Sequence, residues 1–114
     1  MAGKFEIKRA KDEQFYFNLK ARNGEIILTS ETYTTKANAQ HGVTSLMTNA
    51  LLDQRFGRKT SKSGEPYCVL KAANGKPIGV SEMYSSPSAM ENGVESVNRH
   101  APEARLEDLS VETS

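Results

Sequence analysis

The sequence contains no tryptophan, only four prolines and a single cysteine, Cys68, so no disulfide can form within the chain. A lone cysteine is typical of proteins that work in a reducing compartment. No apolar run approaches the roughly 18 residues that a membrane-spanning helix needs. The first 14 residues are too rich in charge to contain the apolar region of a signal peptide. We therefore expect a cytoplasmic protein with no membrane partner.

Motifs that mark common enzymes are also absent. The sequence has no G-x-x-x-x-G-K-[ST], G-x-G-x-x-G or H-E-x-x-H motif. Nothing in it therefore indicates a P-loop nucleotidase, a dinucleotide-binding enzyme or a zinc protease. Cys68 could be a nucleophile with His41 or His100 as its base. The apolar alternation around Cys68 instead favours a buried, inert thiol. One cysteine cannot complete a common zinc set. We expect no metal, no cofactor and no catalytic residue, and an enzyme is the less favoured interpretation.

Charge is balanced overall but unevenly placed along the chain. Fifteen basic residues oppose 14 acidic ones, which argues against whole-molecule attraction to nucleic acid or anionic membranes. Residues 55 to 76 hold six basic residues and one acidic residue, whereas residues 77 to 114 hold two and seven. These segments are either solvated faces that neutralise each other after folding or a binding patch.

The most informative feature is an internal repeat. Shifting the sequence by 51 residues aligns residues 16–50 with residues 67–101, and 14 of the 35 pairs are identical. The shared frame reads Y-x-x-L-K-A-x-N-G-x-x-I-x-x-S-E-x-Y, followed by G-V-x-S and a final Ala. We interpret residues 1–114 as one domain made of two fused copies, the first at about 3–54 and the second at about 55–110.

Each copy begins with the pattern of a β-hairpin. Residues 14–22 alternate between apolar and polar side chains, as a half-buried strand does. Asn23-Gly24 follows, which predicts a type I′ turn with both residues at positive φ, and residues 25–30 form the returning strand. The second copy repeats this at 66–72, Asn74-Gly75 and 76–81. Pro77 places the last of these strands near a sheet edge or delays the start of its pairing.

A helix follows each hairpin, because the apolar period changes from two to about 3.6. Thr35 and Ser86 occupy equivalent N-cap positions, with Pro87 at a first helical position. Gly42 and Gly93 mark places where the helix backbone approaches the sheet closely. The expected helical stripes are Ala39, Val43, Leu46, Met47 and Ala50 in the first copy and Met90, Val94, Val97 and Ala101 in the second, which Pro102 ends.

Three further strands complete the pattern, at residues 4–9, 55–60 and 104–110. Residues 55–60 could serve both copies, closing the first and opening the second. Residues 61–65 have the composition of a turn. The expected core comprises Phe15, Phe17, Leu19, Ile27, Val43, Leu46, Leu70, Ile78, Val94 and Val97.

The doubled L-K-A-x-N-G and S-E-x-Y patterns, with the opening K-F-E-I-K and the bridging R-F-G-R-K-T, resemble the duplicated members of the small bacterial YegP-like family. The resemblance implies an α+β fold of two tandem β(3)-α-β repeats that share a single antiparallel sheet, with two helices on one face and the terminal strands exchanged. Such a chain is expected to be a monomer with pseudo-two-fold symmetry. No activity is implied. Gly57 departs from the pattern and predicts a weakened or bulged strand.

Two groups of residues are candidates for binding. The first is the sheet face away from the helices, where aromatic and cationic side chains alternate, as in proteins that stack and neutralise single-stranded nucleic acid. An exposed sheet face or edge can equally receive a protein or peptide partner. The candidate face comprises Tyr16, Asn18, Lys20, Arg22, Tyr67 and Lys71.

The second candidate is a pair of polar corners between strand and helix. A Ser, Glu and Tyr cluster at this place either satisfies loose backbone donors or forms two symmetric pockets for a polar ligand or a small active site. The corners comprise Ser30, Glu31 and Tyr33 in the first copy and Ser81, Glu82 and Tyr84 in the second. We favour a non-enzymatic binding or accessory module, with single-stranded nucleic-acid binding and corner chemistry as the alternatives.

Overall fold

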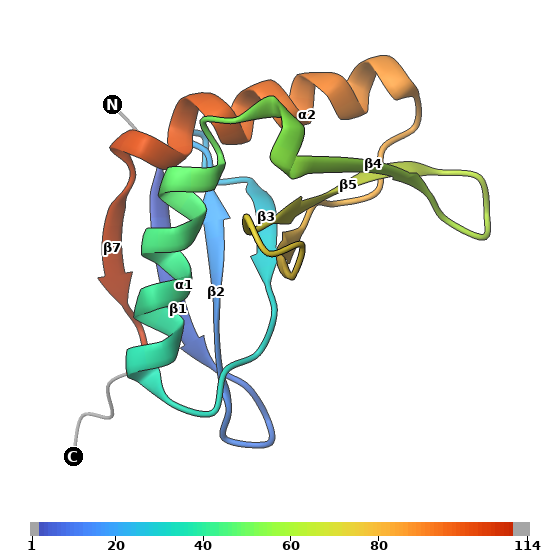
Figure 1. Cartoon of the computed structure of the whole chain (residues 1–114). Coiled ribbons are helices and arrows are strands. Elements are labelled where there is room, and N and C mark those ends of the chain that lie inside the picture. Colours follow the sequence, from blue (N-terminus) through green and yellow to red (C-terminus); the bar gives the residue numbers. More distant parts are fainter. Residues whose placement is uncertain (1–2, 111–114) are drawn as a thin grey trace.

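One seven-stranded sheet runs through the computed structural model, which describes residues 3–110. Its strand order is β4-β5-β6-β3-β2-β1-β7. Both helices pack on one side of it, α1 chiefly against β2 and α2 against β5 (Figure 1). The elements are β1 (Lys4–Arg9), β2 (Phe15–Lys20), β3 (Ile26–Ser30), α1 (Lys36–Asn49), β4 (Phe56–Thr60), β5 (Pro66–Lys71), β6 (Pro77–Val80), α2 (Pro87–His100) and β7 (Arg105–Asp108), with 3-10 turns at Asp53–Arg55 and Ala101–Glu103. The two-repeat α+β fold is confirmed.

The repeats meet in the middle of the sheet, where β3 and β6 pair antiparallel. Thr29 lies opposite Val80, and these two residues are equivalent under the 51-residue shift, so a pseudo-two-fold axis passes between them. The final strand of the second repeat, β7, adds to β1 of the first, and the Leu109 N–H donates to the Ile7 carbonyl at 2.8 Å. The terminal strand is therefore exchanged. This pair is parallel, so the sheet is mixed although its other strand pairs within residues 3–110 are antiparallel.

Strand β4 opens the second repeat and pairs only with β5 in the described part of the chain. The position beside β4 that corresponds to β7 on β1 holds no strand from residues 3–110. The expected bulge at Gly57 is wrong, because the register runs unbroken from Phe56 to Thr60. The irregularities fall instead at Leu19/Lys20 and Leu70/Lys71, where each hairpin approaches its turn.

The hairpin turns differ from the expected type I′. Only Gly24 of the Asn23-Gly24 pair has positive φ, at 89°. The Ala21 N–H donates to the Glu25 carbonyl at 2.9 Å and the Gly24 N–H to the Ala21 carbonyl at 2.9 Å, which defines a three-residue loop ending in a left-handed glycine. The turn at Asn74-Gly75 has the same bonds. Pro77 occupies the first position of an interior strand and so does not mark an edge; it pairs with Lys71 of β5, whereas pairing with β3 begins only at Gly79.

Both helices start as expected. The Thr35 hydroxyl accepts a hydrogen bond from the Asn38 N–H, and the Ser86 hydroxyl accepts one from the Ala89 N–H, each at 3.1 Å. Neither helix is long and apolar enough to cross a membrane, and residues 3–110 hold no other helix that could. Of the expected stripes, only Met47 is half-buried and the other residues are buried.

The core lies between the sheet and the helices. Nine of the ten expected core residues are buried, and Phe15 is half-buried beneath the Arg9 guanidinium, which lies 5.1 Å from the ring centroid. Phe5 and Ile7 of β1 are fully buried and belong to the core as well. Phe5 meets Phe17 edge to face at 5.9 Å.

Candidate functional site

The sheet face opposite the helices carries one continuous row of side chains across six strands. Cross-strand pairing places these residues side by side in the order Glu6, Asn18, Thr29, Val80, Val69 and Gly57. The first three belong to repeat one and the last three are their equivalents in repeat two. The row is therefore polar in one half of the open face and apolar in the other, although the backbone is nearly symmetric.

Glu6 is the centre of the polar half and is only 4% exposed. Its carboxylate lies 3.3 Å from Lys4 Nζ, 3.6 Å from Lys8 Nζ and 3.0 Å from Lys20 Nζ. Burial tends to raise the pKa of Glu6, but Lys20 and Lys4 outweigh it and hold that pKa below its ordinary value. Glu6 is thus a buried anion surrounded by lysines.

Asn18 is tied into the same network. Its carbonyl oxygen accepts a hydrogen bond from Lys8 Nζ at 3.0 Å, and its amide donates to Thr29 Oγ1 at 2.9 Å. At 3% exposure, Asn18 cannot contact a ligand directly. Asn18 belongs to the candidate face by position, and its hydrogen bond with Lys8 holds that side chain in place.

The two tyrosines of the face occupy equivalent positions and have equivalent neighbours. Tyr16 lies opposite Lys8, and Tyr67 lies opposite Lys59. Both tyrosines are half-buried. Lys8 and Lys59 are not among the face residues predicted from the sequence, although their separation of 51 residues, the length of the repeat, was a signal that they belong there.

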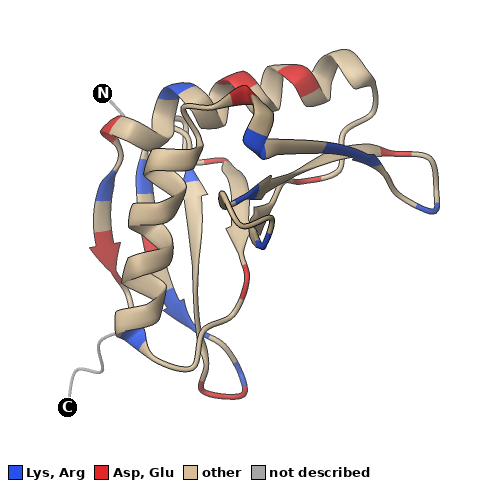
Figure 2. Ribbon diagram, in the orientation of Figure 1, with Lys and Arg blue, Asp and Glu red and all other residues tan. Residues whose placement is uncertain are grey.

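Positive charge dominates this face. Neither Lys59 nor Lys71 has a carboxylate partner within residues 3–110, and Gly57 stands where repeat one has Glu6. Figure 2 shows lysine and arginine on the strands at both ends of the sheet. Within residues 3–110 the strands place five lysines on the open face, Lys4, Lys8, Lys20, Lys59 and Lys71, against two carboxylates, those of Glu6 and Glu107.

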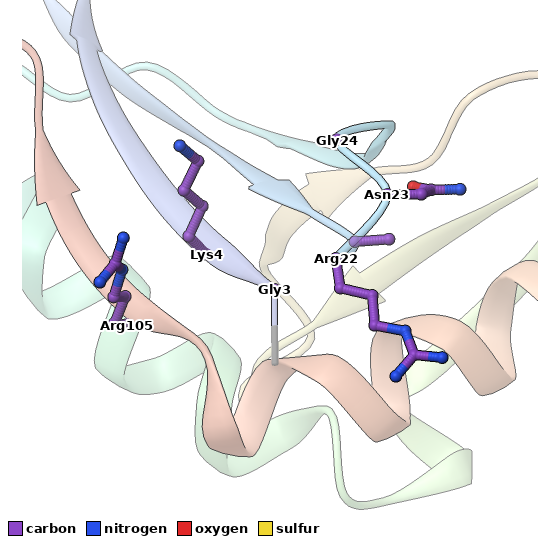
Figure 3. Close-up of a pocket in the computed structure, with 7 residues that line it drawn as sticks. Gly3, Lys4, Arg22, Asn23, Gly24 and Arg105 are labelled. Atoms are coloured by element: carbon purple, nitrogen blue, oxygen red, sulfur yellow. The ribbon is translucent and has the colours of Figure 1, made fainter. Parts of the chain in front are cut away.

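Arg22 lies apart from this face. It follows β2 in the turn, is exposed, and lines a cleft of about 320 Å³ with Lys4 and Arg105. In Figure 3 the side chains of Lys4 and Arg22 point away from one another, with Arg22 directed toward the helical layer. The three cations therefore do not converge on one small anion.

The two serines of the corners are buried, and the hydroxyl of each forms hydrogen bonds with two backbone groups. Ser30 Oγ accepts a hydrogen bond from the Phe17 N–H at 2.8 Å and donates to the Glu31 carbonyl at 2.7 Å. Ser81 Oγ repeats both bonds at 2.9 Å, with the Cys68 N–H and the Glu82 carbonyl. These hydroxyls satisfy backbone groups of the neighbouring strand and of the following glutamate.

The glutamates and tyrosines of the corners do not join the serines. Glu31 and Glu82 are exposed. Tyr33 and Tyr84 lie over Gly42 and Gly93, where an added Cβ would overlap the tyrosine hydroxyl. The close approach expected at these glycines is therefore made by a tyrosine ring, and at Gly42 also by the Phe17 ring of the sheet. Burial raises the pKa of Tyr33 and of Tyr84.

Cys68 is fully buried on the helix side of β5, and burial raises the pKa of its thiol. Neither histidine forms a hydrogen bond with it. Within residues 3–110, no three His, Cys, Asp or Glu side chains are grouped to hold a metal ion. The thiol packs as a small apolar group, in the position that Phe17 occupies in repeat one.

Comparison with known proteins gives one consistent match. The sequence profile of the family described as "Domain of unknown function (DUF1508)" matches twice, at residues 10–56 and 61–108. The chain is 48% identical to "UPF0339 protein YegP" of Yersinia pestis, covering 96% of this chain and 97% of that protein. It is 51% identical to a UPF0339 protein of Bordetella pertussis, covering 95% and 96%.

Two solution NMR structures have the same fold. A UPF0339 protein from Shewanella oneidensis gives a TM-score of 0.91 at 44% identity, covering 98% of this chain and 95% of that chain. The "protein of unknown function yegP from E. coli" gives 0.93 at 42% identity, covering 99% and 97%. This chain therefore shares its fold with these two proteins over nearly its whole length.

Proposed function

The chain belongs to the DUF1508 family, and from the surface of its sheet we propose that it is a non-enzymatic binding module whose open face binds single-stranded nucleic acid. One observation carries the proposal. Two Tyr–Lys cross-strand pairs, Tyr16 with Lys8 and Tyr67 with Lys59, are related by the pseudo-two-fold axis on a face that no helix of residues 3–110 covers. A tyrosine ring can stack on a base of any identity, and the adjacent ammonium can contact its phosphate.

The arrangement favours a single strand over a duplex. Tyr16 and Tyr67 are three strand spacings apart and lie on opposite sides of the central row, roughly 20 Å from one another. Bases must leave their stack to reach aromatic rings on a sheet, which single strands allow at little cost. The apolar residues Val69 and Val80 between the tyrosines leave room for a base or sugar rather than for a row of phosphates.

The test is an amide NMR titration with a short single-stranded oligonucleotide at low and then at higher salt. We expect shifts on β2 and β5 that weaken as salt rises. Tyr67→Ala should lower the affinity at least about fivefold, the loss of one stacked base. Lys71→Glu should lower the affinity and flatten its salt dependence, because a phosphate contact is lost.

Arg99→Glu is the matched control, since Arg99 is exposed on α2 and the substitution changes the net charge equally. It should leave the affinity nearly unchanged. An equal loss in Arg99→Glu and Lys71→Glu would mean attraction by net charge alone. A spectrum that does not respond to the oligonucleotide at low salt would contradict the proposal.

A further inference from the structure

A second surface lies on the helix side of the sheet and is independent of the open face. It is a cleft of about 410 Å³ between α1 and the β5–β6 turn. Asn38, His41 and Ser45 line it from α1, where spacings of three and four residues place them on one side of the helix. Lys76 lines it from the turn, and Tyr33 lines it beside Gly42.

The chemistry of the lining is one-sided. Among residues 3–110 the lining presents the Lys76 ammonium, the His41 imidazole, the Tyr33 hydroxyl and the Asn38 amide, and it includes no carboxylate, although Glu31 nearby helps to raise the pKa of Tyr33. Within residues 3–110 the side chains of these four residues form no hydrogen bond or ion pair, so their polar groups are available to a ligand. Pro77 and Ile78 add an apolar wall. A site of this composition is complementary to an anion that carries an apolar body.

The pseudo-two-fold axis relates this cleft to an equivalent site around Tyr84 in the second repeat, and the two sites can be compared. Tyr84 lies over Gly93 as Tyr33 lies over Gly42, and Ser96 stands for Ser45. The groups that would bind an anion are different. Ala89 stands for Asn38, Asn92 for His41, and Glu25 for Lys76.

Glu25 also faces its corner. Burial raises the pKa of Tyr84, and Cys68, Glu82 and Glu25 raise it further, just as burial and Glu31 raise the pKa of Tyr33. Glu31 and Glu82 are equivalent, so the difference in charge between the two sites is that Glu25 stands in place of Lys76. The two corners thus share their packing and differ in their charge, which indicates that packing alone does not explain the residues around Tyr33.

We propose that the cleft at Tyr33, His41 and Lys76 binds a small organic anion, a carboxylate or phosphate attached to an apolar or aromatic body. The anionic group contacts Lys76 and His41 at the rim. The body lies against Pro77, Ile78 and the Tyr33 ring. The proposal does not depend on nucleic-acid binding, because the two surfaces lie on opposite sides of the sheet.

The experiment is an amide NMR titration of the full chain with phenyl phosphate, with benzoate and with neutral benzyl alcohol. We expect the two anions to shift residues 38–45 and 74–78, and the stronger of them identifies the charged group preferred. Benzyl alcohol should bind at least about fivefold more weakly, because it lacks the charged contact. Equal binding of benzyl alcohol, or no shift in this region at about 10 mM anion, would overturn the proposal.

Exchanging equivalent residues between the Tyr33 site and the Tyr84 site gives matched variants. His41→Asn with Lys76→Glu gives the first corner the residues of the second, and both side chains are exposed, so folding should be kept. We expect this variant to bind the anion about tenfold more weakly. Asn92→His with Glu25→Lys makes the opposite exchange and should create binding at residues 89–96. Unchanged affinity in the first variant would contradict the assignment of Lys76 and His41, whatever the open face does.

Discussion

Replacing Glu6 by alanine is expected to lower the free energy of unfolding by about 3 kcal/mol, at the lower end of the cost of removing one partner from a buried ion pair. Lys8 and Lys20 would then lose the carboxylate they pair with, and Lys4 would keep only the partly exposed Glu107. Their ammonium groups are partly exposed, and this partial solvation keeps the loss from being larger. Urea denaturation at neutral pH measures the change.

Glu107→Ala is the matched control on the same face. Glu107 is 39% exposed and pairs with Lys4 at 3.4 Å, so its removal should change stability by less than about 0.5 kcal/mol. If Glu6→Ala costs no more than Glu107→Ala, then Glu6 is not the anchor of the lysine cluster. The lysines would in that case be held by their packing and by their remaining partners, Asn18 for Lys8 and Glu107 for Lys4.

The stability that Glu6 contributes should depend on pH with a definite sign. Its pKa in the folded protein lies below its ordinary value, so the contribution is fully present above the unfolded pKa and is lost as pH falls through the folded one. The stability difference between the native protein and Glu6→Gln should therefore be largest near neutral pH. It should shrink between about pH 5 and pH 3. A difference that grows on acidification would contradict the lowered pKa.

Local chemistry made the secondary structure predictable from the sequence. Period-two and period-3.6 patterns, the N-caps Thr35 and Ser86 and the prolines define elements through contacts between near neighbours. The turn type was not predictable in the same way. Asn23-Gly24 fits the two positive φ angles of a two-residue loop, but also fits a three-residue loop in which only the glycine is left-handed. The choice is made by the bulge at Leu19/Lys20, which depends on the whole strand pair.

The candidate face was only partly predictable, because its chemistry depends on strand register. Alternation places Asn18 and Lys20 on the face, but their contact with Glu6 requires the register between β1 and β2. One signal was present in the repeat itself. Glu6, Asn18 and Thr29 all become apolar or glycine in the second copy, at Gly57, Val69 and Val80. Such concerted loss of polarity indicates that the three residues contact one another.

Ser30→Ala and Ser81→Ala are each expected to lower the free energy of unfolding by about 1 to 3 kcal/mol. Each hydroxyl is buried and accepts a hydrogen bond from a buried backbone N–H, of Phe17 or of Cys68. Without the hydroxyl that N–H would stay unsatisfied, which costs the desolvation of the group. Urea denaturation measures both changes.

Glu31→Ala and Glu82→Ala are the matched controls from the same corners. Both side chains are exposed, so their loss should change stability by less than about 0.5 kcal/mol. This contrast separates the members of the repeated S-E-x-Y pattern by their physical task. The serine satisfies the N–H of Phe17 or Cys68 in the neighbouring strand, the tyrosine packs on a helix glycine, and the glutamate remains in solvent. If the serine variants are as stable as the native protein, the hydroxyls are not needed by the backbone. They would then be available to a ligand in the native protein, and the corners would again be candidate active sites.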